Sequence, residues 1–481
     1  MKIVMLNPPF LDKYSKSSRS PAVTKSGTIY FPLWLSYATG VLDRLGHKIT
    51  LIDAPAKCYS KEETLKIITD LAPALIVIDT STASISSDLA FSESIKSRLP
   101  HTKTCLVGTH ATACVKEIIP QENYVDYIAR HEYDYTLPEL ADAIEGKIKL
   151  SEVKGVSYND NGKFVSNPDR EYIRDLDELP FVSEVYKKYL DIKDYFYAHV
   201  NYPTVSIFSS RGCPSKCFYC MYSQVMFGKA YRKRSAKSLY DECVYITENF
   251  PEVKEILIDD DNFAVDQNNV RAFCQLMIDN KLKLKWVVQC RVTLEYETMN
   301  LMKKAGCRLV VVGYESGSQK VLDGMHKGIT IEQSRKFNDA AKKAHLRVHG
   351  CFMVGNPGET KDTMNETLEF SKKLHMDTVQ YFPLIVYPGT EAWIWAEQNN
   401  YITAKNYDQW LTTDGMHNCV LSTPEVSDKE LVDFCNYARK KFYLRPKYVL
   451  MKLGECLTSK DDLVRTFKAF GTFKKYLLKM S

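Results

Sequence analysis

Three cysteines stand close together near the middle of the chain, at Cys213, Cys217 and Cys220. They form a C-x₃-C-x₂-C run, and thiolates are soft ligands that favour iron–sulfur clusters and zinc. A structural zinc site needs a fourth Cys or His, yet the next cysteine is Cys243 and no histidine follows at zinc-finger spacing. Three thiolates can hold three irons of a cubane cluster and leave the fourth iron open. The pattern therefore predicts a catalytic cluster.

The residues around this run resemble those of a known family. The cysteines follow an apolar strand candidate, Thr204–Phe208, and Tyr219 supplies the aromatic residue of a C-x₃-C-x-aromatic-C loop. This loop resembles the cluster loop of the radical S-adenosylmethionine (radical SAM) enzymes. The resemblance implies that Cys213, Cys217 and Cys220 bind a [4Fe-4S] cluster whose open iron chelates SAM. It also implies that one electron cleaves SAM to a 5′-deoxyadenosyl radical, which abstracts hydrogen from a substrate.

Length and composition are those of a globular protein with more than one domain. The 481 residues suffice for two or three domains, and the hydrophobic and charged contents, 45% and 26%, are ordinary. No apolar run is long enough for a membrane span. The opening strand-like run, Lys2–Leu6, is too short for a signal-peptide core. Fourteen cysteines without a signal peptide indicate a reducing compartment, so we expect a cytoplasmic protein.

Residues 1–150 alternate short apolar runs with amphipathic helical patterns. The strand candidates are Lys2–Leu6, Lys48–Ile52, Leu75–Asp79, Thr104–Val107 and Tyr124–Ala129. This alternation predicts βαβ units, a parallel sheet and a doubly wound, flavodoxin-like domain. Residues 151–195 are predicted to form a hairpin, with its turn at Asn159–Gly162, and a linker.

A second α/β series follows the linker. Its strand candidates are Thr204–Phe208, Glu255–Ile258, Lys285–Gln289, Arg308–Gly313, Arg347–Val354 and Thr378–Leu384. Six β/α units resemble the partial (β/α)₆ barrel of radical SAM enzymes, so we expect the core at residues 196–400. Active sites of such barrels lie at the carboxyl ends of the strands. Residues 401–481 are predicted to be a basic, helical C-terminal region.

Three consecutive acids, Asp259–Asp261, follow the second strand of this series. Buried carboxylates repel one another and need a cation or hydrogen-bond donors nearby. In the family, this position contacts the aminoacyl group of SAM, whose ammonium is a suitable cation. The resemblance therefore makes Asp260 and Asp261 candidate SAM ligands, with the choice between them open. A solvated turn or a helix N-cap is the alternative.

The fourth strand of the series ends in Gly313–Gly317, a Gly-x-Glu-Ser-Gly element that is similar to one in the family. A carboxylate at this position can accept hydrogen bonds from both ribose hydroxyls. The resemblance implies that Glu315 binds the ribose of SAM. The Gly-x-Glu-Ser-Gly sequence alone is weak evidence for a SAM site. It is stronger evidence here because it follows the cysteine motif and the acid run in the order found in the family.

The fifth strand runs into a glycine-rich segment, Gly350–Thr360. Glycines let a backbone approach a flat ligand without a clash at Cβ. The segment resembles the family's adenine-binding edge, which implies contacts through Gly350, Val354, Gly355 and Gly358. A plain turn, with Glu359 and Thr360 opening a helix, is the alternative, and both can hold together.

The N-terminal residues resemble those of radical SAM proteins with a cobalamin (B12)-binding-type domain. The matching stretches are Leu6–Pro9, Pro32–Leu35, Gly46-His47 and Asp53–Pro55. Some relatives of this subgroup act in hopanoid and other lipid or surface-glycan pathways. The Asp-x-His-x-x-Gly element, whose His binds cobalt in many B12 domains, is absent. His110 is the nearest substitute, and a lone His is more often structural, so cobalamin binding stays open.

The resemblance implies an enzyme that acts on an organic metabolite or lipid, with an electron donor of the flavodoxin or ferredoxin type. If cobalamin binds, we expect methylation. If it does not, we expect rearrangement, ring contraction, C–C bond formation or dehydrogenation. One alternative is a methylthiotransferase acting on RNA. Those relatives carry a second, N-terminal three-cysteine cluster, and Cys58, Cys105 and Cys114 are too scattered to match it. A non-catalytic metal-binding scaffold is another alternative.

Charge is concentrated at the C-terminal end of the chain. Residues 439–481 hold twelve Lys and Arg against three acids, while the whole chain has a net charge of +5. The cations are mixed with aromatic and aliphatic residues, a composition that can rest on anionic lipid headgroups. A solvated helical face is the alternative, and nucleic acid is disfavoured because no RNA-binding module is recognised. We therefore expect peripheral contact with the inner membrane face, or none.

Overall fold

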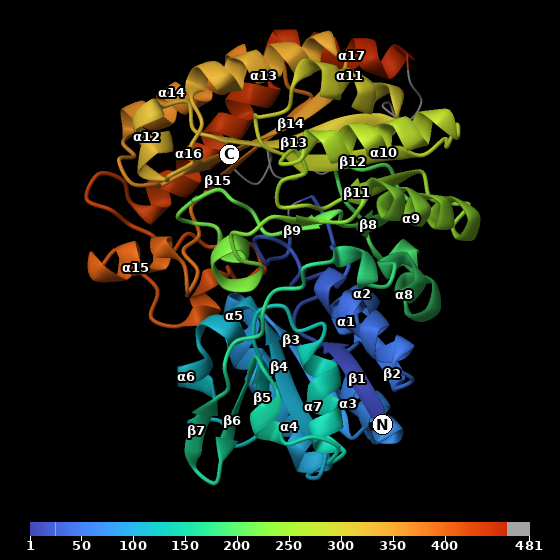
Figure 1. Ribbon diagram of the computed structural model, residues 1–481. Helices are drawn as coiled ribbons and strands as arrows, with labels where there is room; N and C mark the ends of the chain where they lie inside the picture. Colours follow the sequence, from blue (N-terminus) through green and yellow to red (C-terminus); the bar gives the residue numbers. More distant parts are fainter. Residues whose placement is uncertain (25, 459–481) are drawn as a thin grey trace.

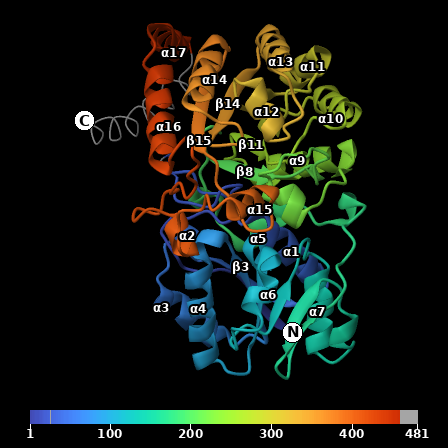
Figure 2. The same ribbon diagram turned by 90° about the vertical axis from the view of Figure 1, so that its left-hand side faces the viewer.

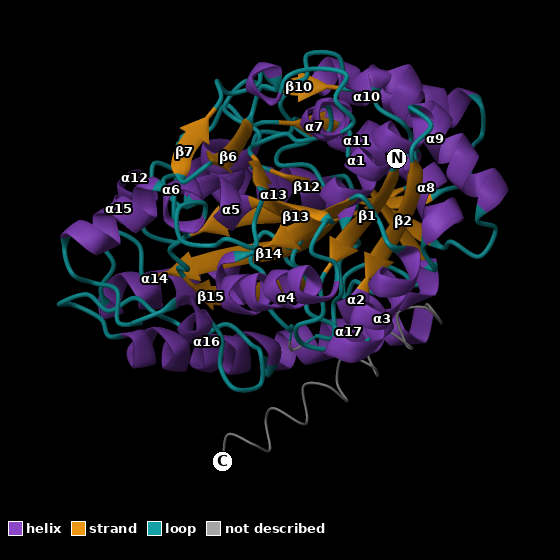
Figure 3. Cartoon of the chain, turned by 90° about the horizontal axis from the view of Figure 1, so that it is seen from below, coloured by secondary structure: helices purple, strands orange, loops and turns teal. Residues whose placement is uncertain are grey.

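The computed structural model describes residues 1–24 and 26–458 and arranges them in two α/β units. The N-terminal unit lies at the bottom of Figure 1 and the second unit at the top, and Figure 2 shows the same arrangement from the side. Seen from below, the strands of both sheets run between layers of helices (Figure 3). The predicted α/β class is confirmed.

The N-terminal unit is built on a seven-stranded sheet of order β2-β1-β3-β4-β5-β6-β7. Its parallel strands are β1 (Lys2–Asn7), β2 (Lys48–Asp53), β3 (Leu75–Thr80), β4 (Lys103–Gly108) and β5 (Tyr127–Ala129). The order 2-1-3-4-5 is that of flavodoxin-like folds, as predicted. The predicted hairpin is also present, as β6 (Val156–Asp160) and β7 (Lys163–Ser166), and it extends the same sheet.

Alternate residues of β1 face opposite layers of helices, because successive strand side chains point to opposite faces. Ile3 and Met5 pack with residues of α1 (Leu33–Arg44) and α7 (Thr136–Ile144). Val4 and Leu6 pack with α3 (Lys61–Leu71) and α4 (Ile85–Arg98). The short helices α2 (Ala54–Lys57), α5 (Thr109–Ala113) and α6 (Val115–Ile118) complete this unit.

The second unit has a six-stranded parallel sheet of order β15-β14-β13-β12-β11-β8. Its strands are β8 (Thr204–Ile207), β11 (Glu255–Ile258), β12 (Lys285–Cys290), β13 (Cys307–Glu315), β14 (Arg347–Val354) and β15 (Thr378–Pro383). The connecting helices are α9 (Ala236–Asn249), α10 (Gln267–Asp279), α11 (Tyr296–Lys304), α12 (Gln319–Gly324), α13 (Ile331–Lys343) and α14 (Lys361–Lys373). All six predicted strands are confirmed, and neighbours in sequence are neighbours in the sheet, as in a partial barrel.

The C-terminal region is helical only in part. Its helices are α16 (Asp428–Tyr443) and α17 (Pro446–Thr458), preceded by α15 (Glu391–Gln398). Residues 401–427 instead form turns, isolated bridges such as Ile402 to Leu421, and the short η6 (Tyr407–Trp410), so the helical prediction is wrong there. Residues 459–481, the rest of the predicted basic region, lie outside the described part. Within that part, no helix combines the length and apolar character needed to cross a membrane.

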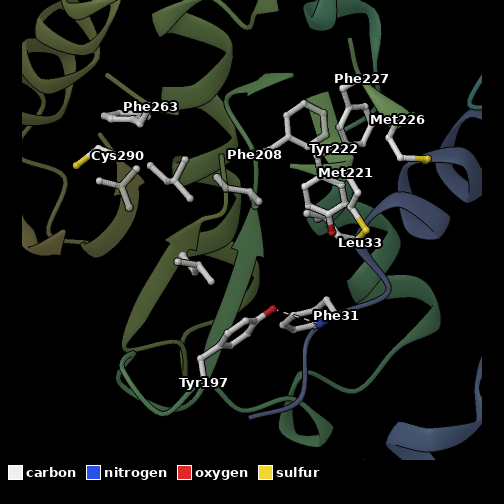
Figure 4. Close-up of a cluster of buried hydrophobic side chains, with 14 of the residues drawn as sticks. Phe31, Leu33, Tyr197, Phe208, Met221, Tyr222, Met226, Phe227, Phe263 and Cys290 are labelled. Carbon is white, nitrogen blue, oxygen red and sulfur yellow. Dashed lines mark hydrogen bonds between the residues drawn. The ribbon is translucent and has the colours of Figure 1, made fainter. Parts of the chain in front are cut away.

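The segment between β1 and α1 joins the two units. Figure 4 shows Phe31 and Leu33 with Tyr197 and Phe208 of the following chain. The Phe31 ring stacks on Tyr186 and Tyr195, with centroids 4.3 and 4.0 Å apart, and its N–H donates to Tyr197 Oη at 3.2 Å. One apolar core runs through both units as a result. The two units therefore share a core and are not separate domains joined only by a linker.

Candidate functional site

The three cysteines lie on one loop between two short strands. The cluster loop, residues 212–231, runs from β9 (Ser210–Arg211) to β10 (Arg232–Lys233), which pair antiparallel. Cys213 and Cys217 are buried, Cys220 is half-buried, and none of the three is in a disulfide. A π-helical turn, η5 (Tyr222–Met226), follows directly. The three predicted ligands thus lie on one loop, after the end of β8.

Gln224 holds the loop in a compact form. Its Nε2 donates to the carbonyl oxygens of Cys217, Phe218 and Cys220 at 3.1, 2.9 and 3.3 Å. Its Oε1 accepts from the N–H of Glu391 at 2.9 Å. Gln224 therefore fixes the backbone around two of the cysteines, and nothing in the spacing of the motif marks it out.

The three cysteines are the residues that would hold a cluster. Within the described residues, no three His, Cys, Asp or Glu side chains stand together so as to hold one metal ion. A cubane places each thiolate on a different iron, so wider spacing is expected. Burial and the nearby Asp261 raise the pKa of the Cys220 thiol to about 11, a cost that bound cations would offset. Arg291 Nη1 also donates to Cys217 Sγ, at 3.4 Å.

Glu315 lies beside the cluster loop with one carboxylate oxygen unused. Oε1 accepts from Lys327 Nζ at 2.6 Å and from Tyr219 Oη at 3.0 Å. Oε2 is buried and has no hydrogen-bond partner. A buried acceptor without a donor is costly, so this oxygen fits a ligand hydroxyl. The structure thus brings the two predicted residues, Tyr219 and Glu315, into contact.

The backbone at Glu315 is unusual. Its φ is +63°, in the left-handed region that residues other than glycine rarely adopt. Such strain costs of the order of 1–3 kcal/mol and is concentrated at functional sites. A Cβ at Gly313 would stand 2.3 Å from Glu315 Oε1. The predicted Gly-x-Glu element therefore has a local reason: the glycine makes room for the bent carboxylate.

The three acids after β11 have different surroundings. Asp260 is almost fully buried, and it accepts from the N–H groups of Ser209 and Ser210 at 2.6 and 3.1 Å and from both hydroxyls. Burial raises the pKa of Asp260 to about 6, against the lowering effect of these bonds. Asp260 therefore anchors the residues that lead into β9. Asp261 faces a different partner.

Arg19, from the N-terminal unit, lies across this acid run. Its Nη1 donates to Asp259 Oδ1 at 2.6 Å, and its Nη2 donates to Asp260 O at 2.7 Å and Asp261 Oδ1 at 3.2 Å. Burial raises the pKa of Asp261, and the guanidinium opposes that rise. Arg19 is the cation that three adjacent acids require. Its partners are about 240 residues away in sequence, so no sequence pattern could reveal it.

The glycine-rich edge runs from inside β14 to the turn that follows the strand. Val354 is fully buried, and Gly355 has φ +94° and donates its N–H to Glu359 Oε2 at 3.2 Å. Gly358 also has a positive φ, of +84°. Gly350 lies inside β14, where a Cβ would meet Met376 Sδ at 2.3 Å. Gly355 and Gly358 thus allow the backbone conformation of the turn. Gly350 is needed because a larger residue would clash with Met376.

The strand ends of the N-terminal sheet face the second unit. The turn η1 (Thr82–Ser84), after β3, packs on η6, and α5, after β4, packs on η5. His110, on α5, is buried with its Nδ1 3.3 Å from Thr82 Oγ1 and its ring edge-on to Tyr407. Burial lowers the pKa of His110 to about 3, so the imidazole stays neutral. These contacts fit the structural interpretation of His110.

A buried ion cluster ties the N-terminal unit to the base of the cluster loop. Arg211 and Arg232 stand opposite each other in the β9–β10 pair. Arg232 Nη1 donates to both carboxylate oxygens of Glu132 at 2.8 and 2.7 Å, and Arg211 donates to Asp134 at 2.7 and 3.1 Å. Like charges opposite each other destabilise a strand pair. The two carboxylates, which follow β5, offset that repulsion from the other unit.

Two family models match the chain. Residues 19–141 match the B12 binding domain, and residues 207–371 match the radical SAM superfamily. The first stretch spans most of the N-terminal unit. The second begins at the last residue of β8 and ends within α14, so it contains the cluster loop, the acid run and Glu315.

Similar proteins cover nearly the whole chain. An uncharacterized methyltransferase of Pyrococcus horikoshii is 28% identical over 95% of both chains. The hopanoid C-3 methylase of Methylococcus capsulatus is 24% identical over 78% of this chain and 70% of its own. The radical SAM methyltransferase TsrM of Kitasatospora setae has the same fold, with a TM-score of 0.66, 18% identity, and coverage of 84% and 76%. The chain is a radical SAM enzyme with an N-terminal B12-binding domain.

Proposed function

We propose that this enzyme is a cobalamin-dependent radical SAM methyltransferase acting on an organic metabolite or lipid. The observation that carries the proposal is the contact between the two cofactor edges. The carboxyl ends of the N-terminal strands, where open α/β sheets bind ligands, pack through α5 against η5 of the cluster loop. A methyl carrier bound at the first edge would lie next to the SAM site. The methyltransferase and methylase relatives support this choice.

The residues of the site fit the cluster and SAM. Cys213, Cys217 and Cys220 would hold the cluster. The buried Oε2 of Glu315 would accept from the ribose. The turn at Gly355 and Gly358 would border the adenine, with the buried and unpaired Asn356 Oδ1 beside it. When bound, these groups supply the one-electron cleavage of SAM, and cobalamin supplies the carriage of a methyl group.

Asp261, rather than Asp260, is the better candidate for the aminoacyl end of SAM. Asp260 already accepts four hydrogen bonds from Ser209 and Ser210. Asp261 shares Arg19 with Asp259. A ligand ammonium at this position would add a second cation to an acid run that still carries net negative charge.

We propose that no protein imidazole would bind the cobalt. His110 is the candidate with the best position, and it is held between Thr82 and Tyr407. Turning it out would remove a buried ring from its contacts. The electron donor is proposed to be of the flavodoxin or ferredoxin type, and the substrate to be a small molecule or lipid rather than nucleic acid.

The test uses protein purified without air, with its cluster reconstituted and with hydroxocobalamin added. SAM with a deuterated methyl group is then supplied with a reductant. We expect about one cobalamin retained per chain, 5′-deoxyadenosine, and the label on the bound cobalamin. Retention that is lost in His110→Ala would contradict the proposed His-free site. No retention at all would shift the function to a radical rearrangement or C–C bond formation.

A further inference from the structure

Helix α17 leaves a row of apolar side chains exposed. The exposed fractions are 42% for Val449, 68% for Leu450, 57% for Leu453 and 89% for Leu457. On a helix with 3.6 residues per turn, these four positions fall within an arc of about 100°. Leu444, just before the helix, is 54% exposed. We call Val449, Leu450, Leu453 and Leu457 the leucine stripe.

The opposite side of α17 is bound to the second unit. Tyr448 Oη donates to the carbonyl oxygen of Asp377 at 2.9 Å, and Lys452 pairs with the Asp377 carboxylate. Asp377 directly precedes β15. The helix is therefore fixed in orientation, and its leucine stripe points away from the sheet. An exposed and contiguous apolar row of this kind marks an interaction surface.

Cations border the leucine stripe. Lys447 stands on one side of it, about 110° from its centre on the helical wheel, whereas Lys452, on the other side, is 11% exposed and pairs with Asp377 and Glu455. Lys441, on α16, and Lys447 are exposed. Residues 439–458 contain six Lys and Arg and one acid, Glu455. Apolar side chains between flanking cations are the pattern of a helix that lies in a membrane interface.

We propose that α17 docks the enzyme on an anionic lipid bilayer, with the leucine stripe in the interface and the exposed Lys441 and Lys447 at the headgroups. The charge of the surrounding residues favours a bilayer over the other partners that could cover the leucine stripe. The 23 residues after Thr458 contain six Lys and Arg and two Asp, so they are also cationic. Packing them, or the same face of a second copy, on this surface would bring like charges together. An anionic bilayer attracts both segments.

The docked orientation follows from the place of α17 in the fold. In Figures 1 and 2, α17 lies at the top of the second unit and the N-terminal unit lies at the bottom. Its contact with Asp377 is at the amino end of β15, whereas Glu315 is the last residue of β13 and the cluster loop comes after the carboxyl end of β8. The bilayer would therefore bind the side of the second unit that lies opposite the candidate site.

The experiment measures binding of the full-length enzyme to vesicles by flotation. Neutral vesicles contain phosphatidylcholine alone, and anionic vesicles contain about one third phosphatidylglycerol. We expect binding to the anionic vesicles only, weakening as salt rises. Each buried leucine contributes roughly tenfold or more to the partition coefficient, and each lysine about fivefold. Leu450→Glu with Leu453→Glu should therefore abolish binding, and Lys447→Glu should weaken it at least fivefold.

Leu45→Glu is the matched control, because Leu45 is 61% exposed and lies at the end of α1, in the other unit. It should bind as the wild type does. All variants change exposed side chains, so unchanged thermal melting and unchanged 5′-deoxyadenosine formation would show that they are folded. Wild-type protein that binds neither vesicle overturns the proposal, as does binding that survives the double leucine variant.

Three further outcomes would also overturn the proposal, because each would show that another partner covers the leucine stripe or binds the cations. Concentration-dependent dimerisation that Leu450→Glu abolishes would assign the leucine stripe to a second copy. Vesicle binding by a chain ending at residue 458, but not by the full chain, would assign it to residues 459–481. Equal retention on single-stranded RNA, insensitive to the leucine changes, would assign the cations to nucleic acid.

Discussion

Arg232 donates two hydrogen bonds to Glu132, at 2.8 and 2.7 Å, across the boundary between the two units. Both side chains are buried, at 8% and 2% exposure. Glu132 also accepts from the N–H of Ile173, at 2.9 Å, and so binds the linker as well. The strand pair that closes the cluster loop therefore depends on a carboxylate of the B12-binding domain.

Replacing Glu132 with Gln should destabilise the protein and loosen the cluster. Removing one partner of a buried ion pair costs about 3–5 kcal/mol, here at the base of the loop that carries the cysteines. We expect a lower melting temperature and faster loss of iron to a chelator. Glu139→Gln is the control, since Glu139 pairs with Arg170 at 39% exposure and such surface pairs contribute about 0–1 kcal/mol. Equal iron loss in both variants would contradict the linkage.

The cysteine assignment can be tested by iron content. Changing Cys213, Cys217 and Cys220 together to Ala should remove the iron and the visible absorption of thiolate-bound iron, because these thiolates are the proposed ligands of the cluster. Cys58→Ala, which changes an exposed cysteine, should leave both unchanged. About four irons per chain in the triple variant would refute the assignment.

Glu315 should contribute directly to SAM affinity. Charge-assisted hydrogen bonds to a buried carboxylate are worth roughly 1.5–3 kcal/mol, so Glu315→Ala should weaken SAM binding by about tenfold to a hundredfold. Equilibrium dialysis with reconstituted protein measures this, and Glu332→Ala, which changes an exposed side chain of α13, is the control. Unchanged SAM affinity in a folded Glu315→Ala protein would exclude this residue from the site.

Arg19 should stabilise the contact between the units. Arg19→Ala leaves Asp259 and Asp261 without their guanidinium, and we expect a loss of about 2–3 kcal/mol in the free energy of unfolding by urea. Arg19→Lys should recover only part of it, because one ammonium cannot reach all the acceptors of the guanidinium fork. Full recovery by Lys would show that charge alone matters. Equal stability of all three proteins would remove Arg19 from the interface energetics.

Most of the fold could be predicted because the strands are apolar runs separated by amphipathic helices. Those runs predicted the parallel strands of both sheets within a few residues. The cysteines, Glu315 and the Gly355 turn could be located because each lies at or after the carboxyl end of a strand. Residues 401–427 were wrongly expected to be helical. There, Trp410 and Leu421 are buried through local bridges and side-chain contacts rather than along a helical face.

The rest of the site depends on contacts between residues far apart in sequence. Arg19 reaches Asp259 across 240 residues, and Glu132 reaches Arg232 across 100. Neither contact is signalled by a periodic pattern or a motif spacing in the sequence. The role of Asp260 was also hidden, since its donors are two serines that any strand exit can contain.

Stability should fall as pH rises from about 4 toward 7, partly because of Asp79 at the end of β3. Burial raises the pKa of this carboxyl to about 7, against the lowering effect of Lys16, while Asp88 and Asp53 raise it further. The folded state therefore holds a proton that the unfolded chain, with a pKa of about 4, releases. Stability from this group is full below about pH 4, decreases between pH 4 and 7, and is lost above that range.

Asp79→Asn should flatten this pH dependence, because an amide has no proton to release. Thermal melting between pH 5 and 8 would show it: the wild-type melting temperature should fall as pH rises, and that of the variant should fall less. Asp70→Asn, an exposed pair member on α3, should behave as the wild type does. Parallel curves for wild type and Asp79→Asn would mean that Asp79 is ionised in the folded enzyme, with Lys16 as its effective counter-charge.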